Sequence, residues 1–530
     1  MSSFAYMHAK NGTTYVYQST AYWDKEKKAP RNRMKCVGKL DPKTGKVIYN
    51  REYASRDAQA AAASGAAVSE TVSVGAGLLL GKVTDDLGLE RLLVSSIGKG
   101  KTEMVISLAW YLCCRGDALY LAPGWMESHA CPCHGAPPDN QAVTEFLRSF
   151  GRDDILKFLK AWLKGSKDDG YLCYDITSVS SYSGRNGYVE WGHNRDGERM
   201  EQVNLALLSG QDSDIPFYYK LLPGSLHDSR TLKEMLSELS ALKAGKVRLM
   251  MDKGFYSKAN ITAMQGMGCK FVIPIPSTLR IRDELVDEVR DGLQMPDNIV
   301  QETDGFVYGV TVRRPFCGKR TYYHVYLDTS AQQESANAFV AHIRELRGEL
   351  ERNEPDGAHE DEYKRFFTVS DTPKRGRVVR LIGQNVMDYR DRYAGYWILM
   401  TNCEKDAGKA LAQYRRRDMI EKNFDDMKNE LDMKRLRIQG TEAMESRTFI
   451  QFIALALKQR ILKMAKESVL ESSPTSKNLH SKYTVREIFS RLESYQEISF
   501  TGKYKTVRPS LTKAQAEIFS TFGIDPLASL

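Results

Sequence analysis

The sequence predicts an α/β protein, and three observations support this fold class. Apolar runs of strand length recur at residues 171–177, 203–208, 217–222 and 247–251. Apolar residues at helical spacing mark longer segments, such as residues 78–112 and 449–462. One carboxylate, Asp175, lies within the first strand-like run, and another, Asp252, directly follows the last. Carboxylates near strand ends are expected in α/β proteins, because their sheets hold ligands at that edge.

The composition is that of an ordinary globular chain. The sequence is 42% hydrophobic and 27% charged, which argues against a disordered protein. It has neither a signal-peptide pattern nor eighteen consecutive apolar residues, so we expect a cytoplasmic protein without a membrane span. The nine cysteines are scattered and odd in number, which indicates reduced thiols. The net charge of +9 permits nucleic-acid binding at local basic patches but does not establish it.

A chain of 530 residues is too long for one ordinary domain. Strand and turn signals predict a small β-rich unit over residues 1–66. Within it, residues 25–46 are rich in Lys and Arg and follow Tyr22 and Trp23. Such a segment suits either a phosphate backbone or a solvated surface hairpin, and the sequence leaves both open. The next hundred residues, 67–165, predict a helical unit.

A dense group of possible zinc ligands lies near the end of this helical unit. It consists of His129, Cys131, Cys133 and His134. Their spacing is tighter than that of the usual structural zinc sites. We therefore favour a loop with free thiols, and metal binding stays open as the alternative.

Residues 414–428, YRRRDMIEKNFDDMK, contain no Gly or Pro and predict a single helix. At about 100° per residue, four side chains share an arc of roughly 60° on one face: Tyr414, Arg417, Glu421 and Lys428. The neighbouring face is apolar and would seat the helix on a core. For this helix taken alone, a solvated charged face is the plain alternative.

Three carboxylates thus stand out: Asp175 in a strand, Asp252 at a strand end and Glu421 on the helix. If the fold brings them together, they offer the oxygen ligands that suit two Mg²⁺ ions, with Mn²⁺ as a substitute. In such a site one ion activates an attacking water or hydroxyl, and the other stabilises the leaving oxygen of a phosphodiester.

The same residues resemble the motifs of bacterial insertion-sequence transposases of the DDE class. The signature Y-x2-R-x3-E-x6-K is matched at every spacing by Tyr414, Arg417, Glu421 and Lys428. YDITSVS around Asp175 is similar to the first motif of that family, and DKGFYS, which begins at Asp252, to the second. The resemblance covers about residues 170–465.

This resemblance implies a ribonuclease-H-like catalytic core, in which a mixed sheet is flanked by helices. A β-rich insertion and helical N- and C-terminal additions complete the implied fold. The implied division is 1–66, a small β-rich unit; 67–165, a helical DNA-binding unit; 166–276, the first part of the core; 277–395, the β-rich insertion; 396–465, the second part of the core with the catalytic helix; and 466–530, a C-terminal helical region.

The resemblance also implies roles for residues and partners. The catalytic and metal-binding residues would be Asp175, Asp252 and Glu421. The residues in contact with DNA would be Tyr414, Arg417 and Lys428. The implied reaction is Mg²⁺-dependent cleavage at transposon ends followed by strand transfer. The partners would be double-stranded terminal inverted repeats and target DNA, bound by a homodimer in the bacterial or archaeal nucleoid, with no membrane.

Two other functions remain compatible with these motifs. One is a catalytically silent DNA-binding protein of the same fold, against which the intact carboxylates argue. The other is a ribonuclease-H-like nuclease that hydrolyses DNA without joining it. The two enzymatic functions differ in whether a released 3′-hydroxyl end becomes attached to a second DNA.

Overall fold

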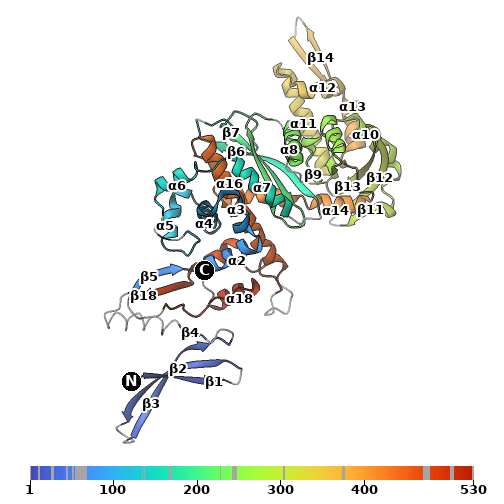
Figure 1. Ribbon diagram of the computed structural model, residues 1–530. Helices are drawn as coiled ribbons and strands as arrows, with labels where there is room; N and C mark the ends of the chain where they lie inside the picture. The colour runs from blue at the N-terminus through green and yellow to red at the C-terminus, as the bar shows by residue number, and fades with distance from the viewer. Residues whose placement is uncertain are drawn as a thin grey trace.

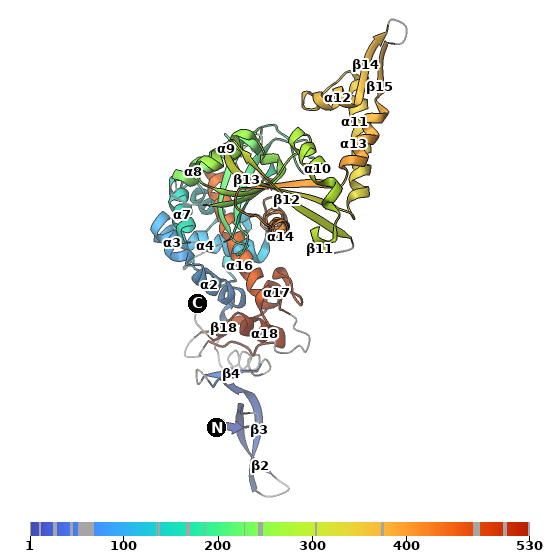
Figure 2. The same cartoon turned by 90° about the vertical axis from the view of Figure 1, so that its right-hand side faces the viewer.

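The computed structural model describes residues 2–9, 12–24, 29–42, 46–50, 53, 68–133, 135, 138–165, 170–184, 186–226, 228–241, 247–302, 305–372, 376–469, 478–501 and 506–527. The described chain is elongated, with a large sheet and its helices in the middle and a smaller projection at each end (Figures 1 and 2). The alanine-rich segment 58–67, a candidate linker in the sequence, lies outside the described residues.

The N-terminal projection is an antiparallel sheet. Its strands are β1 (Ser2–His8), β2 (Thr14–Asp24), β3 (Ala29–Leu40) and β4 (Val47–Tyr49). Its surface carries exposed aromatic side chains, among them Tyr22 and Trp23. The next strand, β5 (Val68–Ser73), pairs with β18 (Gln496–Phe500), so segments from the two ends of the chain lie side by side.

A group of helices follows β5 and packs around one long helix. These helices are α2 (Gly75–Asp86), α3 (Leu89–Ile97), α4 (Lys99–Arg115), α5 (Ala122–Met126), α6 (Asn140–Phe146) and α7 (Arg152–Gly165). The long helix, α16 (Thr441–Glu467), contacts α2, α4 and α7, and all its residues from 448 to 459 are buried. A helix that is apolar on every side is expected at the centre of a large core, and α16 occupies that position.

The main sheet has the strand order β11-β12-β13-β16-β10-β9-β6-β7-β8, with β17 (Arg435–Leu436) beside β6. Four of its strands match the apolar runs of the sequence: β6 (Leu172–Ser181), β7 (Gln202–Gly210), β8 (Pro216–Pro223) and β9 (Arg248–Met251). Two further core strands are β10 (Lys270–Pro274) and β16 (Tyr396–Thr401). Strands β6, β7 and β8 are antiparallel, whereas β9 is parallel to both β6 and β10. The mixed sheet predicted for a ribonuclease-H-like core is confirmed.

Helices cover both faces of this sheet (Figure 2). One face carries α8 (Asp228–Ala241), α9 (Lys258–Gly266) and α10 (Arg280–Leu293), and the other carries α14 (Ala407–Arg415) and α16. Helix α15 (Asp418–Asp425) packs on β6 and β7, where its neighbour Arg417 contacts Asp175. Alternating side chains of the strands follow this division. The hydroxyls of Tyr174 and Tyr218 bond to α8, whereas the ring of Tyr219 packs against Phe452 of α16. Asp175, the neighbour of Tyr174, therefore points to the face of α15.

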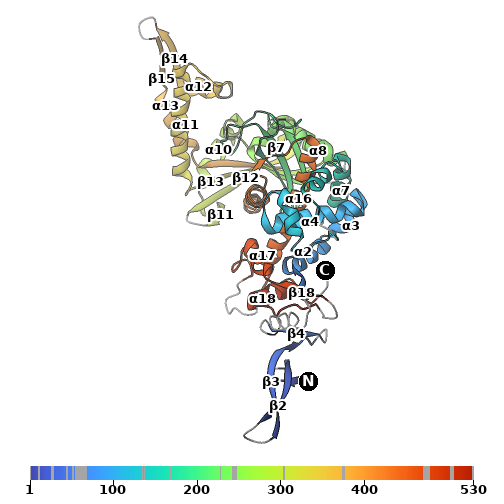
Figure 3. The ribbon, with the colours of Figure 1, turned by 90° about the vertical axis from the view of Figure 1, so that its left-hand side faces the viewer.

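The segment 277–395, expected to be a β-rich insertion, has two parts. Its strands β11 (Ile299–Glu302), β12 (Phe306–Phe316) and β13 (Lys319–Asp328) extend the main sheet, because β13 pairs with β16. Apart from α10, which covers the main sheet, the rest projects from the core (Figure 3) and is mainly helical. It comprises α11 (Gln332–Arg352), α12 (Glu360–Phe366), β14 (Phe367–Thr372), β15 (Gly376–Leu381) and α13 (Gly383–Tyr393).

The C-terminal part contains α17 (Val485–Glu493) and α18 (Lys513–Thr521). Each helix begins after a threonine that forms a reciprocal capping box with the residue three positions on. None of the described helices, taken singly, has the length and apolar character needed to cross a membrane. One sharply bent pair, α4 with the segment Leu119–Met126, meets that criterion by length and composition.

Candidate active site

Strand pairing places Asp175 beside Asp252. The parallel register of β6 and β9 pairs Tyr174 with Met251, so the next residue on each strand is an aspartate. Neighbouring strands lie about 4.8 Å apart, and paired positions of parallel strands point to the same face. Asp175 is buried within β6, while Asp252 is half-buried where β9 ends and a 3-10 turn, η2 (Lys253–Phe255), begins.

Helix α15 brings Glu421 to the same place. Its apolar face, with Ile420 and Phe424 buried, packs against β6 and β7. Asn423 fixes the helix position, since its buried amide donates to the Ser209 hydroxyl of β7 at 3.0 Å. Glu421 lies on the other side of the helix and its side chain is 59% exposed. Glu421 thus sits at the solvent side of the two aspartates.

The predicted single helix over residues 414–428 is wrong in one respect. The chain forms α14 up to Arg415 and starts α15 at Asp418, with a turn at the two arginines between them. Arg416 is held there because its guanidinium donates to the Gln211 carbonyl at 3.0 Å and pairs with Asp212 at 2.8 Å. This anchor to the turn between β7 and β8 is a tertiary interaction, which helix propensity does not include.

Beyond α15 the chain continues as a π-helical turn, η5 (Asp426–Glu430), that is fixed to α16. The buried ammonium of Lys458 contacts Asp426 at 2.7 Å and Glu430 at 3.2 Å. Asp426 is therefore paired with Lys458 and not with the site of the three carboxylates, and Asp418 is exposed to solvent. Of the carboxylates in the signature segment, Glu421 is the one that faces Arg417 and the β6 edge.

Arg417 is the centre of the site. Its guanidinium lies 3.3 Å from the Asp175 carboxylate and 2.7 Å from that of Glu421. It also lies over the ring of Tyr414, 5.8 Å from the ring centroid. Burial acts to lower the pKa of Arg417, whereas Tyr414 and the charges of Asp175, Asp252 and Glu421 act to raise it. Arg417 thus contacts two of the three predicted catalytic carboxylates directly, and the charge of the third, Asp252, also acts on it.

The Asp175 carboxyl is in an environment that disfavours its charge. Burial raises its pKa and is the largest effect, and the charge of Asp252 adds to it. The hydrogen bond from its neighbour Ile176 and the charges of Arg417 and Arg195 act in the opposite direction but do not cancel the effect of burial. A buried carboxylate next to a second carboxylate is an arrangement that a bound cation would stabilise.

The two remaining signature residues lie further along the same surface. Burial raises the pKa of Tyr414, whose ring also lies near Trp397 of β16, with centroids 6.1 Å apart. The half-buried Lys428 of η5 pairs with Asp196 at 2.7 Å. The structure thus brings Tyr414 and Arg417 to the carboxylates and places Lys428 against the loop that follows β6.

Sequence reasoning gave no role to that loop, residues 191–200. Its Arg195 lies 3.6 Å from Asp175 and also bonds to the Ile176 carbonyl. The amide of Asn194 donates to the Ser180 hydroxyl at 3.1 Å, which holds the loop along β6. Arg195 lies 20 residues after Asp175 in a polar segment, WGHNRDGERM, and no spacing pattern in the sequence marks it as part of a site.

The donor set fits a divalent cation that prefers oxygen. The three predicted ligands are carboxylates, and no thiol or imidazole takes part in the contacts that the structure gives to Asp175 and Glu421. They are not yet close-packed, because among the described residues the one trio whose ligand atoms lie within 4.8 Å of one another is elsewhere. The Arg417 guanidinium stands between Asp175 and Glu421 and holds them apart.

One member of the Cys/His group found in the sequence, His129, has a packing role. His129 stacks on Trp125, with centroids 4.6 Å apart, and its Nε2 lies 2.7 Å from Glu493. Burial raises the pKa of the Cys131 thiol, which bonds to the Cys133 carbonyl. His134 lies outside the described residues. This arrangement uses His129 to hold α5 against α17.

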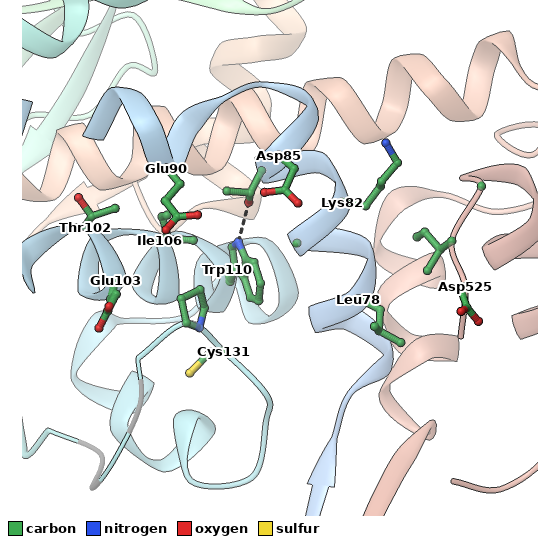
Figure 4. A pocket seen from close by; sticks show the side chains of 15 residues that line it. Leu78, Lys82, Asp85, Glu90, Thr102, Glu103, Ile106, Trp110, Cys131 and Asp525 are labelled. Carbon is green, nitrogen blue, oxygen red and sulfur yellow. Dashed lines mark hydrogen bonds between the residues drawn. The ribbon is translucent and has the colours of Figure 1, made fainter. Parts of the chain in front are cut away.

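A pocket of about 450 Å³ lies near this group, between α2, α4 and the C-terminal segment (Figure 4). Trp110 is central to it and donates to Thr84 at 3.1 Å. Carboxylates line its rim, including Asp85, Glu90 and Asp525. It contains none of the predicted catalytic residues, so the candidate active site lies outside this cavity.

One family model matches more than half of the chain. Residues 167–457 match the family described as the transposase DDE domain. A piggyBac transposase synaptic complex with hairpin DNA aligns over 79% of this chain and 69% of its own, with 12% identity and a TM-score of 0.35. No curated protein matches the sequence.

Two structures of the Mos1 transposase also align. The paired-end complex with the left transposon end covers 25% of this chain and 50% of its own, with 15% identity and a TM-score of 0.15. The Mos1 mariner paired-end complex with Mn covers 27% and 53%, with 14% identity and a TM-score of 0.15. The chain thus spans about half the length of the Mos1 proteins that it matches.

Proposed function

The chain belongs to the transposase DDE domain family, whose members are enzymes of phosphoryl transfer on DNA, and from this premise we propose that it cleaves transposon ends and joins them to target DNA. We assign it to the bacterial insertion-sequence group with the Y-x2-R-x3-E-x6-K signature. The observation that carries the proposal is the meeting of Asp175, Asp252 and Glu421 around Arg417.

Asp175, Asp252 and Glu421 would hold two Mg²⁺ ions, for which Mn²⁺ would substitute. When bound, such ions activate the attacking oxygen and stabilise the leaving oxygen of the phosphodiester. Burial of Asp175 supports this role, because a carboxylate with a raised pKa gains most from a neighbouring cation. In the first step water attacks the phosphorus and the bond to the 3′ oxygen breaks, which leaves a 3′-hydroxyl. In the second step that hydroxyl attacks a target phosphodiester.

Arg417, Tyr414 and Lys428 would contact the DNA near the cut. A phosphate at the carboxylates would compete for the Arg417 guanidinium, which pairs with phosphate and carboxylate in the same bidentate way. Lys428 would exchange Asp196 for a second phosphate. Tyr414 has its hydroxyl beside Arg417 and would hydrogen-bond or stack near the scissile strand.

A basic pocket beside the site continues this surface. It has a volume of about 640 Å³ and is lined by Lys434, Arg435, Arg437 and Arg447, among others. Arg435 belongs to β17, which pairs with β6 five residues beyond Asp175. Phosphates spaced along a duplex would meet these side chains after passing the carboxylates. This continuity supports double-stranded DNA as the substrate.

We extend the proposal to the whole chain with the division given by the sequence, in which the helical unit 67–165 is the DNA-binding one, and we add that the β-rich unit 1–66 would assist it at the terminal inverted repeats. Two protomers would hold two ends together, and the complex would act in the cytoplasm on the nucleoid. The exposed Tyr22 and Trp23 of the N-terminal sheet support a binding role for that unit.

The test is a cleavage and joining assay on a supercoiled plasmid that carries the inverted repeats found beside the gene. Asp175→Ala, Asp252→Ala and Glu421→Ala should each abolish cleavage and leave DNA binding intact. Asp418→Ala, one helical turn before Glu421 on the same helix, is the matched control and should cut normally. Cleavage without joining would indicate a hydrolytic nuclease, and binding without Mg²⁺-dependent cleavage would indicate a silent DNA-binding protein.

A further inference from the structure

A second group of possible metal ligands lies in the projecting part of the insertion. It is formed by His342 of α11, His359 directly before α12, and Glu362 within α12. One ligand atom from each lies within 4.8 Å of the other two. In a tetrahedral Zn²⁺ site two ligand atoms lie about 3.4 Å apart, so side-chain rotations would bring this trio onto one ion.

The contacts within the trio already point its ligand atoms inward. Nε2 of His342 lies 2.9 Å from the Glu362 carboxylate. The two imidazole rings face each other edge to face, with centroids 5.4 Å apart. All three side chains are partly buried, which limits their freedom to turn into solvent.

A further carboxylate fixes the orientation of one histidine. Nδ1 of His359 lies 3.0 Å from Glu349 of α11, and the Tyr363 hydroxyl donates to the same carboxylate. This bond uses Nδ1 and leaves Nε2 of His359 for a ligand. Metal-binding histidines almost always donate their other N–H to a carboxylate or carbonyl in this way. Simple surface ion pairing does not require that second contact.

The trio also lies in a part of the fold that has only a small hydrophobic core. The projecting part has a small hydrophobic core of its own, separate from the main core. That core is built from α11 and α12 through residues such as Leu346, Leu350 and Phe366. Small cores commonly rely on a metal or a disulfide for stability. An ion held by His342 and His359 would tie α11 to the start of α12 beside this core.

We propose that His342, His359 and Glu362 bind one Zn²⁺ ion, with water as the fourth ligand, and that Glu349 positions His359. Two imidazoles and a carboxylate favour zinc over Mg²⁺, which prefers oxygen ligands. The site would stabilise the insertion and is separate from the three carboxylates around Arg417. The proposal therefore stands independently of the proposed reaction.

The test is a titration of the full chain with Zn²⁺ and Co²⁺ in excess Mg²⁺, so that the carboxylates around Arg417 are occupied. The wild-type chain should bind one equivalent at this site. His342→Ala and His359→Ala should lose it, and His8→Ala, in the N-terminal sheet, should keep it. Glu349→Gln should weaken binding by about 10- to 100-fold, as expected for a residue that positions a ligand.

The spectrum of bound Co²⁺ separates this site from the cysteines. Imidazole and carboxylate ligands give visible bands without the near-ultraviolet band of thiolate ligands. A thiolate band that persists in His342→Ala would assign the ion to Cys131 and Cys133 and overturn the proposal.

Glu362→Gln keeps the size of the side chain, so it is the variant that removes a ligand with the least risk of unfolding the chain. Zn²⁺ should raise the thermal unfolding midpoint of the wild-type chain and not that of Glu362→Gln, while both have the same circular dichroism. Equal Zn²⁺ affinity in the wild type, Glu362→Gln and the two histidine variants would refute the site.

Discussion

Replacing Arg417 by alanine should have opposite effects on metal binding and on cleavage. In the DNA-free chain the guanidinium stands between Asp175 and Glu421 and competes with any cation for their oxygens. Its removal should therefore tighten the binding of Mg²⁺ or Mn²⁺. If Arg417 also contacts the scissile phosphate, as we propose, the same variant should cleave DNA poorly. A residue with a purely structural role would not change these two quantities in opposite directions.

The size of the effect follows from the two contacts. Asp175 is only 10% exposed, and a hydrogen bond between buried charged groups contributes about 1.5–3 kcal/mol. Glu421 is 59% exposed and one helical turn away, so that contact contributes only about 0.3–0.5 kcal/mol. A total of roughly 2–3 kcal/mol corresponds to a metal affinity about 30- to 100-fold higher in Arg417→Ala, since 1.4 kcal/mol is tenfold. Arg195 still lies near Asp175 in this variant and competes with the metal ion, so we expect an increase in metal affinity near the lower end of this range.

The assay is calorimetric titration of the DNA-free chain with Mn²⁺ at mildly alkaline pH, because the raised pKa of Asp175 means that its ionisation is favoured as the pH rises. The matched control is Arg415→Ala, which removes the same charge from the end of α14. Arg415 is exposed and lies 3.8 Å from Asp328, away from the carboxylates, so its loss should leave the Mn²⁺ affinity unchanged. An Arg417→Ala variant that binds Mn²⁺ no more tightly than Arg415→Ala would show that the guanidinium does not hold the ligands.

Three further substitutions test the surroundings of the site. Burial raises the pKa of Asp175 in the folded chain above its value in the unfolded chain, so ionisation of Asp175 lowers the stability of the folded chain at high pH but not at a pH below the unfolded pKa. The thermal unfolding midpoint of Asp175→Asn should therefore be no lower than that of wild type at pH 7. Any difference between the two midpoints should vanish toward pH 3. Lys458→Met leaves Asp426 and Glu430 without their buried cation and should cost about 3 kcal/mol in urea unfolding, and an unchanged midpoint would contradict the role of this pair. Gly116→Ala should cost at least about 1–2 kcal/mol in the same assay, because Gly116 has φ +65° and its Cβ would lie 2.4 Å from the Glu430 carbonyl oxygen.

The strands of the core were accessible from sequence because each is buried on both faces. Such strands read as short continuous apolar runs, and all nine residues of β7 are buried. The position of Asp252 at the end of β9 could be predicted for the same reason. The sequence did not predict which strands pair with each other, because pairing is set by tertiary packing. Composition alone did not show that β11–β13 continue the main sheet.

The carboxylates of the candidate site could be proposed from the sequence, but the arginine side chains that contact them could not. Asp175 and Asp252 stood out because a carboxylate in an apolar strand is costly without a partner. The partner itself, Arg417, was expected to contact DNA, and its contacts with the carboxylates depend on the break between α14 and α15. Arg195 was missed because it lies in a loop, where neither periodicity nor propensity marks a functional side chain.

The break also changes how the signature spacing should be understood. On one straight helix its four side chains would form a single stripe; the turn before α15 and the π-helical turn after it spread them along the sheet instead. Tyr414 lies near Trp397 of β16, Arg417 beside Asp175 of β6, and Lys428 against Asp196 of the loop after β6. A row of contacts across several strands follows a DNA backbone better than one helical stripe would, because successive phosphates are spaced along the duplex. The spacing therefore matters through the tertiary anchors of the segment, and a variant that straightens it at Arg416 should lose DNA affinity even with all four residues present.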